Sequence, residues 1–341
     1  MVIASGMNFP DALAASSLAG ALHAPIILSD PHTLSPEAQE EIQRLAAKTA
    51  ILIGGTAALS TTVESQISGT VSSGNVLRFA GQTRYDTALA VYQQAQDMLS
   101  VQWSNNAIVA TGSNFTDALS ISPYAYATSS PIFLSDRTET DKGTTAALAS
   151  GKFASAIIVG GTAVVPTQID TYLSSRGVAV SRLAGETRYD TSVRIAQFVL
   201  KSFTTQPNDI VFATGTNFPD ALSGSALAGT HRTALLLVAD KNSPTLTFAQ
   251  QQIPQPQHLY VLGGKSAVAS SVVNSLSMRY GLGEVEPNPN EYVPDADAVT
   301  PGAFCKKQDV WKKGHTVTGV IMICSPDADG QRYRWREYTG W

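Results

Sequence analysis

Cysteine is almost absent from this chain, because its only two cysteines, Cys305 and Cys324, lie after position 300. Their placement excludes a disulfide framework and a thiol nucleophile from the first 300 residues. No apolar run is long enough to cross a bilayer as a helix. An excess of basic residues is missing too, since 23 Lys and Arg stand against 27 Asp and Glu. Without clustered bases the chain does not fit a nucleic-acid-binding protein.

The short motifs of common enzyme classes are also missing. The sequence has no G-x-S-x-G elbow, no G-x-x-x-x-G-K-[ST] loop and no H-E-x-x-H pair, and its strand-end turns carry one Gly instead of G-x-G-x-x-G. We therefore expect no catalysis in this chain and no cofactor. We expect no metal site either, because Cys305, Cys324 and His315 are too few for zinc. The histidines recur at no repeated position, so we interpret them as surface or packing residues: His23, His32, His231, His258 and His315.

What the chain does contain is one motif in three copies. Gly-x-Asn-Phe-[Pro/Thr]-Asp-Ala-Leu occurs with its Asn at positions 8, 114 and 217, so the copies are 106 and 103 residues apart. A Gly-Gly pair keeps the same spacing, with its first Gly at 54, 160 and 263. Two markers at one spacing indicate tandem repeats, and the spacing is that of a small domain.

These markers divide the chain into five segments. We expect repeats over residues 1–73, 76–175 and 180–278, an acidic Pro-rich linker over 281–300, and a small module over 301–341. The first repeat has no counterpart of residues 182–191, so it lacks one strand and one helix. Because Met1 already stands inside a strand-like run, we expect the natural gene product to extend upstream.

Within each repeat, short apolar strands alternate with helices. This order favours an α/β fold with a mainly parallel sheet, right-handed crossovers and helices on both faces. Thr83 is expected to cap the helix that opens the second repeat, and residues 61–64 form a capping-box pattern, Thr-Thr-Val-Glu.

The repeated polar residues all follow the ends of strands. Ligands bind at that edge of an open parallel sheet, where glycines admit a ligand to the backbone and helix N-termini attract anions. Arginine adds bidentate contacts to phosphate or carboxylate, and tyrosine stacks on sugars. The candidate ligand-binding residues are Arg84, Tyr85, Arg188, Tyr189, Asn8, Asp11, Asn114, Asp117, Asn217, Asp220, Gly54, Gly55, Gly160, Gly161, Gly263 and Gly264. The alternative is that each Asp only caps a helix or pairs with Arg84 or Arg188 across a repeat boundary.

Four of these ordered motifs resemble the type 2 cell wall-binding repeat of Gram-positive surface proteins: G-x-N-F-P-D-A-L, P-I-[IF]-L-S, G-G-T-A and R-L-A-G-x-T-R-Y-D-T. The resemblance covers residues 1–277 and departs from the pattern at Phe79, Thr116 and Lys265. It implies three Rossmann- or toprim-like domains around a pseudo-threefold axis. It also implies an exported protein held non-covalently at the cell wall by an anionic secondary polymer, such as a teichoic acid or an anionic polysaccharide, or by peptidoglycan.

Two alternatives remain open at this stage. One is a cell-wall amidase or protease with its catalytic domain outside this chain, and the other is a self-assembling surface-layer protein. Residues 1–282 carry 16 Lys and Arg against 18 Asp and Glu, so an anionic ligand requires local Arg-plus-helix sites or bridging cations. In the C-terminal module we expect a disulfide between Cys305 and Cys324, since so small a core needs a crosslink, and two free thiols are the alternative.

Overall fold

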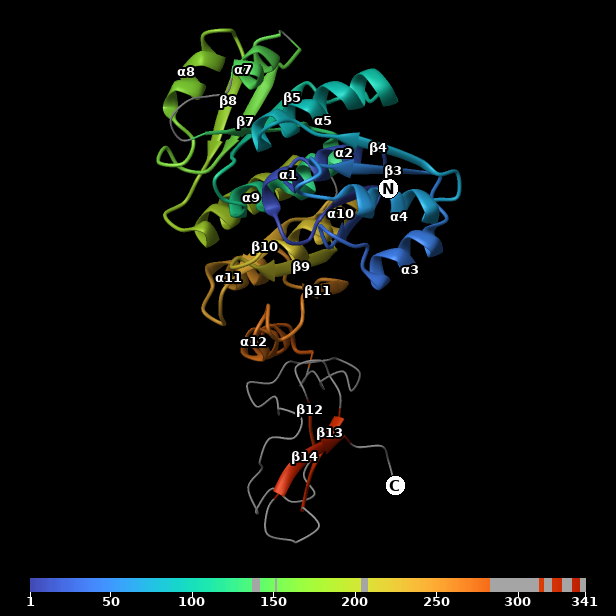
Figure 1. The fold of residues 1–341 in the computed structure, drawn as a ribbon. Coiled ribbons are helices and arrows are strands. Elements are labelled where there is room, and N and C mark those ends of the chain that lie inside the picture. Colours follow the sequence, from blue (N-terminus) through green and yellow to red (C-terminus); the bar gives the residue numbers. More distant parts are fainter. Residues whose placement is uncertain are drawn as a thin grey trace.

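The chain is described here by a computed structural model (Figure 1). The structure describes residues 1–136, 142–150, 152–203 and 208–282, together with the backbone of three strands beyond residue 312. Expectations that fall on other residues, which include Cys305 and most of the linker, lie outside this part of the chain and stay predictions.

The first sheet has four parallel strands in the order β2-β1-β3-β4. The elements that form and cover it are β1 (Val2–Ser5), α1 (Phe9–Ala12), α2 (Ala15–Ala21), β2 (Ile26–Ser29), α3 (Pro36–Leu45), β3 (Thr49–Ile53), α4 (Thr61–Thr70) and β4 (Asn75–Phe79).

The second sheet repeats this order as β6-β5-β7-β8, again with all strands parallel. Its elements are α5 (Arg84–Leu99), β5 (Asn106–Thr111), α6 (Thr116–Thr128), β6 (Ile132–Ser135), α7 (Lys142–Leu148), β7 (Ser155–Val159), α8 (Thr167–Ser174) and β8 (Ala179–Leu183).

The third sheet has three strands in the described residues, in the order β10-β9-β11. Its elements are α9 (Arg188–Ser202), β9 (Asp209–Thr214), α10 (Pro219–Thr230), β10 (Leu235–Val238), α11 (Pro244–Gln252), β11 (His258–Leu262) and α12 (Ser270–Tyr280). A separate antiparallel sheet joins β12 (Lys313–His315), β13 (Ile321–Pro326) and β14 (Tyr333–Glu337).

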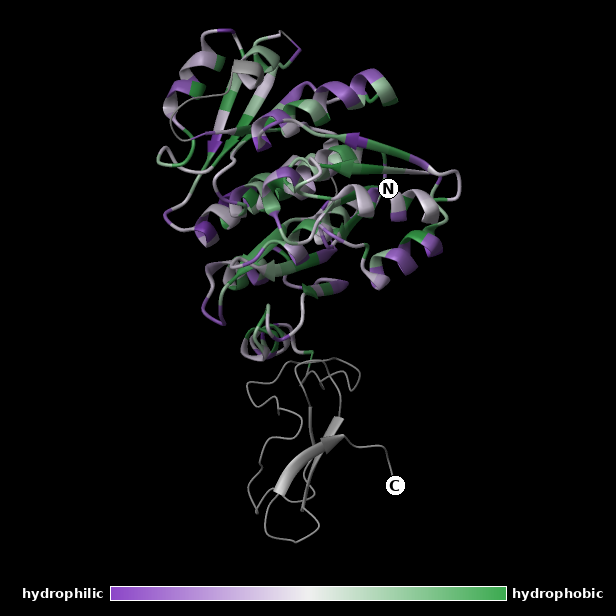
Figure 2. Cartoon of the chain, in the orientation of Figure 1, coloured by the Kyte–Doolittle hydropathy of each residue, from purple (hydrophilic) through white to green (hydrophobic). Residues whose placement is uncertain are grey.

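The expected alternation of strand and helix is confirmed in all three sheets. The central strands β1, β5 and β9 are buried along nearly their whole length, as continuous apolar runs in a parallel sheet require. In Figure 2 the strands are mostly hydrophobic, and the outer helices carry more hydrophilic residues.

The sheets are offset from the sequence repeats by one strand. β4, which we placed at the start of the second repeat, pairs with β3 of the first sheet, and β8 pairs with β7 of the second. The helix after each of these strands then packs on the following sheet, α5 against β6 and α9 against β10. The first sheet therefore has four strands although the first repeat lacks one, and each strand–helix segment links two neighbouring sheets.

The three sheets share one core around a central helix cluster. Each sheet contributes one helix that follows its central strand: α2 after β1, α6 after β5 and α10 after β9. These three helices pack against one another. One continuous apolar cluster contains buried residues from all three, among them Leu18, Leu119 and Leu222. Two smaller clusters fill the outer faces of the first and second sheets. The molecule is thus a threefold arrangement of open sheets around packed helices.

Candidate functional site

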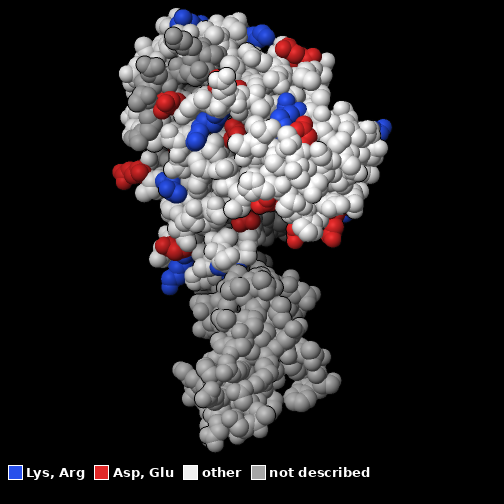
Figure 3. All heavy atoms as spheres, viewed as in Figure 1, with Lys and Arg blue, Asp and Glu red and all other residues white. Residues whose placement is uncertain are grey.

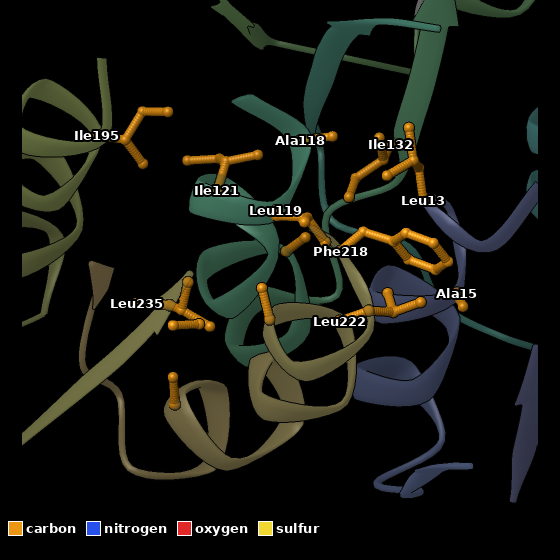
Figure 4. Close-up of a cluster of buried hydrophobic side chains, with 14 of the residues drawn as sticks. Leu13, Ala15, Ala118, Leu119, Ile121, Ile132, Ile195, Phe218, Leu222 and Leu235 are labelled. Atoms are coloured by element: carbon orange, nitrogen blue, oxygen red, sulfur yellow. The ribbon is translucent and has the colours of Figure 1, made fainter. Parts of the chain in front are cut away.

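The Asn-Phe-x-Asp turns of the three repeats meet at the centre of this arrangement. The ring centroid of Phe9 lies 5.4 Å from that of Phe115 and 6.1 Å from that of Phe218, and Phe115 and Phe218 are 6.1 Å apart. Edge-on contacts at these distances are favourable for aromatic rings. Figure 4 shows Phe218 in the shared core with Leu13 and Leu119, which come from the other two repeats. The strand-end motifs therefore converge on one axis.

Each Gly-Gly pair forms a turn that an aspartate covers. The first glycine has a positive φ in every copy, 107° at Gly54, 104° at Gly160 and 98° at Gly263. A Cβ on these glycines would lie 2.8, 2.7 and 2.5 Å from the Oδ2 atoms of Asp11, Asp117 and Asp220, respectively. Only glycine fits both the backbone conformation and the space. The carbonyls of Gly55, Gly161 and Gly264 accept hydrogen bonds from the residue three positions on.

The two arginines at the starts of α5 and α9 reach across to the next sheet. Nη1 of Arg84 donates to the carbonyl of Gly112 at 2.6 Å, and Nη1 of Arg188 donates to that of Gly215 at 2.7 Å. The guanidinium carbon of Arg84 also lies 5.7 Å from the centroid of the Phe9 ring, which places its charge beside the axis.

The tyrosines that follow these arginines pack against the same glycines. A Cβ at Gly112 or Gly215 would lie 2.6 Å from Cε1 of Tyr85 or Tyr189. Burial raises the pKa of both hydroxyls. The rings therefore pack against these turns, and their proposed stacking on sugars stays a prediction.

Burial dominates the electrostatics of the aspartates. It raises the pKa of Asp117 to about 6, and the nearby charge of Arg188 opposes the shift. Burial also raises the pKa of Asp220. The charge of Arg188 thus lies near Asp117 across a repeat boundary, but among the described residues the two form no direct ion pair, and Asp–Arg pairing stays a prediction.

The three asparagines differ in what they contact. Asn114 Oδ1 accepts from the backbone N–H of Thr116 at 3.2 Å, and Asn217 Oδ1 accepts from that of Phe218 at 2.9 Å. Asn8 makes no side-chain cap and is exposed. The carboxamide nitrogen of each has no protein acceptor in the described part of the chain, so these groups are free to donate to a ligand.

Sequence reasoning missed two further repeated arginines. Arg78 donates to the carbonyl of Gly54 at 2.8 Å and forms an ion pair with Glu64 at 2.9 Å. Arg182 donates to the carbonyl of Gly160 at 2.8 Å and pairs with Asp170. An arginine at the same place in two edge strands, with an acid in the preceding helix, was the available signal. Both hold a Gly-Gly turn in place.

The only histidine cluster in the described residues lies at the other end of the third sheet. Nδ1 of His231 and Nδ1 of His258 each approach one carboxylate oxygen of Asp209, where β9 begins. Burial raises the pKa of Asp209, the two hydrogen bonds lower it, and the balance is below its ordinary value. This cluster is not repeated in the other sheets, and among the described residues no group of side chains suits a metal ion.

Charged side chains are scattered over the face shown in Figure 3, without a continuous basic surface. Within the described ranges, no helix is long and apolar enough to cross a membrane. An anion would therefore bind to individual arginines and not to a broad basic surface.

Two solved structures from Clostridium difficile are similar to this chain. The chain superposes on Cwp6 with a TM-score of 0.71 and 23% identity, covering 81% of this chain and 43% of that one. It superposes on Cwp8 with a TM-score of 0.70 and 24% identity, covering 83% and 47%. These likenesses establish the fold.

Curated relatives come from Bacillus subtilis (strain 168). The chain is 26% identical to N-acetylmuramoyl-L-alanine amidase LytC over 333 residues, which cover 96% of this chain and 64% of that protein. It is 29% identical to an amidase enhancer over 279 residues, which cover 81% and 36%. The chain thus spans less than two thirds of either relative.

A family model described as cell wall binding domain 2 matches three successive segments, residues 1–64, 78–170 and 182–273. The matches account for most of the chain and coincide with the three copies of the strand-end motif. The chain therefore belongs to the family of proteins that carry cell wall binding domain 2.

Proposed function

We propose that this chain anchors a surface protein to the bacterial cell wall by binding an anionic secondary polymer where the three strand-end motifs meet. The observation that carries the proposal is the convergence of Phe9, Phe115 and Phe218 with Arg84 beside them. A rim of arginine, asparagine amide and aromatic edge suits a phosphate- or carboxylate-bearing sugar polymer.

Arg84 and Arg188 are the anion-binding groups of this proposal. Each donates one Nη1 hydrogen bond to a carbonyl, and their Nε and Nη2 groups have no acceptor among the described residues. A guanidinium has five N–H donors, so each arginine keeps several for a ligand. The carbonyl contact fixes the side chain in advance and reduces the entropy lost on binding.

Asp117 and Asp220 set a pH dependence for this binding. Burial raises the pKa of Asp117 to about 6 and also raises that of Asp220, so acidification toward pH 5 neutralises Asp117 before it affects a polymer phosphodiester. Repulsion between the site and the anion then falls, and affinity is expected to increase.

The test uses purified poly(glycerol phosphate) and the full chain. Arg84→Gln combined with Arg188→Gln should weaken binding at low salt by about tenfold or more, since each lost charge-assisted contact contributes about 1.5–3 kcal/mol. Arg44→Gln combined with Arg194→Gln changes the net charge equally at two exposed positions, and should have little effect. Thermal unfolding of both double variants shows whether they are folded. If both double variants lost affinity for the polymer equally, only the net charge would matter, and the proposed site would be wrong.

The proposed function gives no residue of this chain a catalytic role. LytC is named as an amidase, but its match to this chain spans the binding repeats and 64% of its length. A hydrolase domain joined to this chain in a longer protein remains the second candidate. Release of muramic-acid-linked peptides from sacculi by the longer protein, but not by this chain alone, would favour it.

A further inference from the structure

The antiparallel sheet of β12, β13 and β14, red in Figure 1, lies outside the three segments that match the family model. Its register places Ile323 of the central strand opposite Lys313 of β12 and opposite Arg336 of β14. Ser325, two residues further along β13, is opposite Arg334. Directly opposed residues of an antiparallel pair lie on the same face, and residues two apart along a strand share that face. Lys313, Arg334 and Arg336 therefore lie on one face of the sheet.

The two faces of this sheet differ in composition. One face holds the bases, and we call it the basic face: Lys313, His315, Arg334 and Arg336 on the outer strands, with Ile321, Ile323 and Ser325 on the central strand. The other face of β13 and β14 is mostly apolar, with Met322, Cys324, Pro326, Tyr333, Trp335 and Glu337. An antiparallel sheet commonly packs one face on a core and leaves the other to solvent, and the apolar composition favours the second face for the core. Within the three described strands no acidic residue shares the basic face.

The bases of the basic face are close together. Neighbouring strands are about 4.8 Å apart, so the Cα atoms of Lys313 and Arg336 are about 10 Å apart across β13. Arg334 and Arg336 are about 7 Å apart along one strand. These spacings do not exceed the Debye length of about 10 Å at 0.1 M salt, so the three charges act together on a ligand. A ligand with several anionic groups along its length matches this arrangement better than a single small anion.

The C-terminal part of the chain also has the opposite charge balance to the repeats. Residues 300–341 carry seven Lys and Arg against four Asp and Glu, whereas residues 1–282 carry 16 against 18. Two of the bases on the basic face are arginines, whose planar fork of N–H donors matches a phosphate bidentately. A phosphodiester chain combines this group with the repeated charge that the spacing requires.

We propose that the basic face is a second binding surface for a phosphodiester polymer of the cell wall, formed by other residues than the site at the axis of the repeats. The choice of polymer rests on the proposed function, whereas the surface itself is inferred from the register and charge of a different sheet. Two contacts on one chain make the second binding event intramolecular, so together they hold a long polymer more tightly than either alone. Membership of a cell wall binding family favours this occupant over the chain's own acidic residues 283–299.

The experiment measures binding of the full chain to poly(glycerol phosphate) over a range of NaCl concentrations. The tail variant combines Lys313→Gln, Arg334→Gln and Arg336→Gln. Each phosphate contact to a single-stranded polyanion contributes about 0.7 to the slope of log K against log salt concentration, so losing three contacts should reduce the slope by about 2. Affinity at low salt should fall by about tenfold or more, since these contacts are strongest there.

The matched control removes the same kinds of charge from exposed positions of the repeats: Arg44→Gln, Arg194→Gln and Lys201→Gln. It changes the net charge equally and should keep the slope close to that of the wild type. Hydrogen exchange of the β13 amides shows whether the tail variant keeps its sheet, because this strand pairs on both sides. A second tail variant, Lys313→Arg with Arg334→Lys and Arg336→Lys, retains the charge and should retain the slope.

The proposal is overturned if the tail variant, with its sheet intact, binds the polymer like the wild type, or if it and the control lose slope equally. Unchanged binding in the tail variant together with lost binding in the Arg84→Gln and Arg188→Gln variant would confine the polymer to the axis. The reverse result would contradict the axis site and support the basic face. The chain's own residues 283–299 would be the occupant if the tail variant binds like the wild type, while replacing their acids by amides raises polymer affinity only when the three bases are present.

Discussion

At the scale of single residues, the repeated aspartates and glycines act as pairs. Asp117 is almost fully buried above Gly160, and its carboxylate takes the space that a side chain at that glycine would need. Replacing Gly160 would combine a strained backbone with a steric clash. The sequence motif is therefore constrained by packing as well as by any ligand.

The raised pKa of Asp117 gives a pH-dependent stability. With a folded-state pKa of about 6, against 3.8 as the reference value, its protonated form favours folding at low pH, and that contribution is lost as the pH rises through 6. Asp117→Asn mimics the protonated acid. We expect its stability relative to wild type to increase between pH 4 and pH 8 by up to about 3 kcal/mol. Urea unfolding at the two pH values measures the change.

Asp97→Asn, at an exposed position on α5, is the matched control for this measurement. This control shows how replacing an exposed carboxylate by an amide changes the free energy of unfolding. If the stability of both variants relative to wild type changed equally with pH, the assignment of a raised pKa to Asp117 would be wrong.

At the scale of elements, close helix packing depends on two glycines that flank Tyr126. A Cβ at Gly20 would lie 2.0 Å from the backbone oxygen of Tyr126, and one at Gly229 would lie 2.6 Å from its Cβ. The equivalent position is thus small in α2 and α10 and large in α6. A buried hydrogen bond between the hydroxyls of Ser16 and Ser225, 2.9 Å long, joins α2 to α10 about one helical turn before these glycines.

Gly20→Ala should therefore disrupt the packing of α2 on α6. The backbone of Tyr126 cannot move aside as a flexible side chain would, so we expect a loss of about 1–3 kcal/mol or more of unfolding free energy. Gly69→Ala in α4 is the control, because nothing lies within 4 Å of its added methyl group. It should stabilise the chain by about 0.5–1 kcal/mol. A Gly20 variant as stable as wild type in thermal unfolding would contradict the packing argument.

The sequence predicts the type and order of elements better than their partners. Thr83 caps α5 in a capping box as expected, but the cap of α4 is Ser60, one residue before the predicted Thr61, and Glu64 binds Arg78 instead of closing a box. Repeat spacing locates β4 and β8, yet it cannot tell which sheet receives them, since a strand between two sheets has the same local pattern in either. The meeting of the three phenylalanines likewise depends on how the repeats pack.

At the scale of the whole molecule, three open sheets place their strand-end motifs around one axis. A single repeat offers one Asn-Phe-x-Asp turn, and three repeats bring together the aromatic cluster with Arg84 beside it. Arg84 thus places a positive charge beside the axis although residues 1–282 carry more acids than bases. This geometry fits a binding module that recognises a polymer at one place. A self-assembling surface-layer protein would instead associate with itself without polymer.

The most direct test is sedimentation of the full chain with purified cell-wall sacculi, before and after their secondary polymers are removed by acid extraction. Our account predicts that the chain binds intact sacculi and that stripping abolishes binding, with bovine serum albumin as the non-binding control. Equal binding to intact and stripped sacculi would contradict the account and assign the ligand to peptidoglycan.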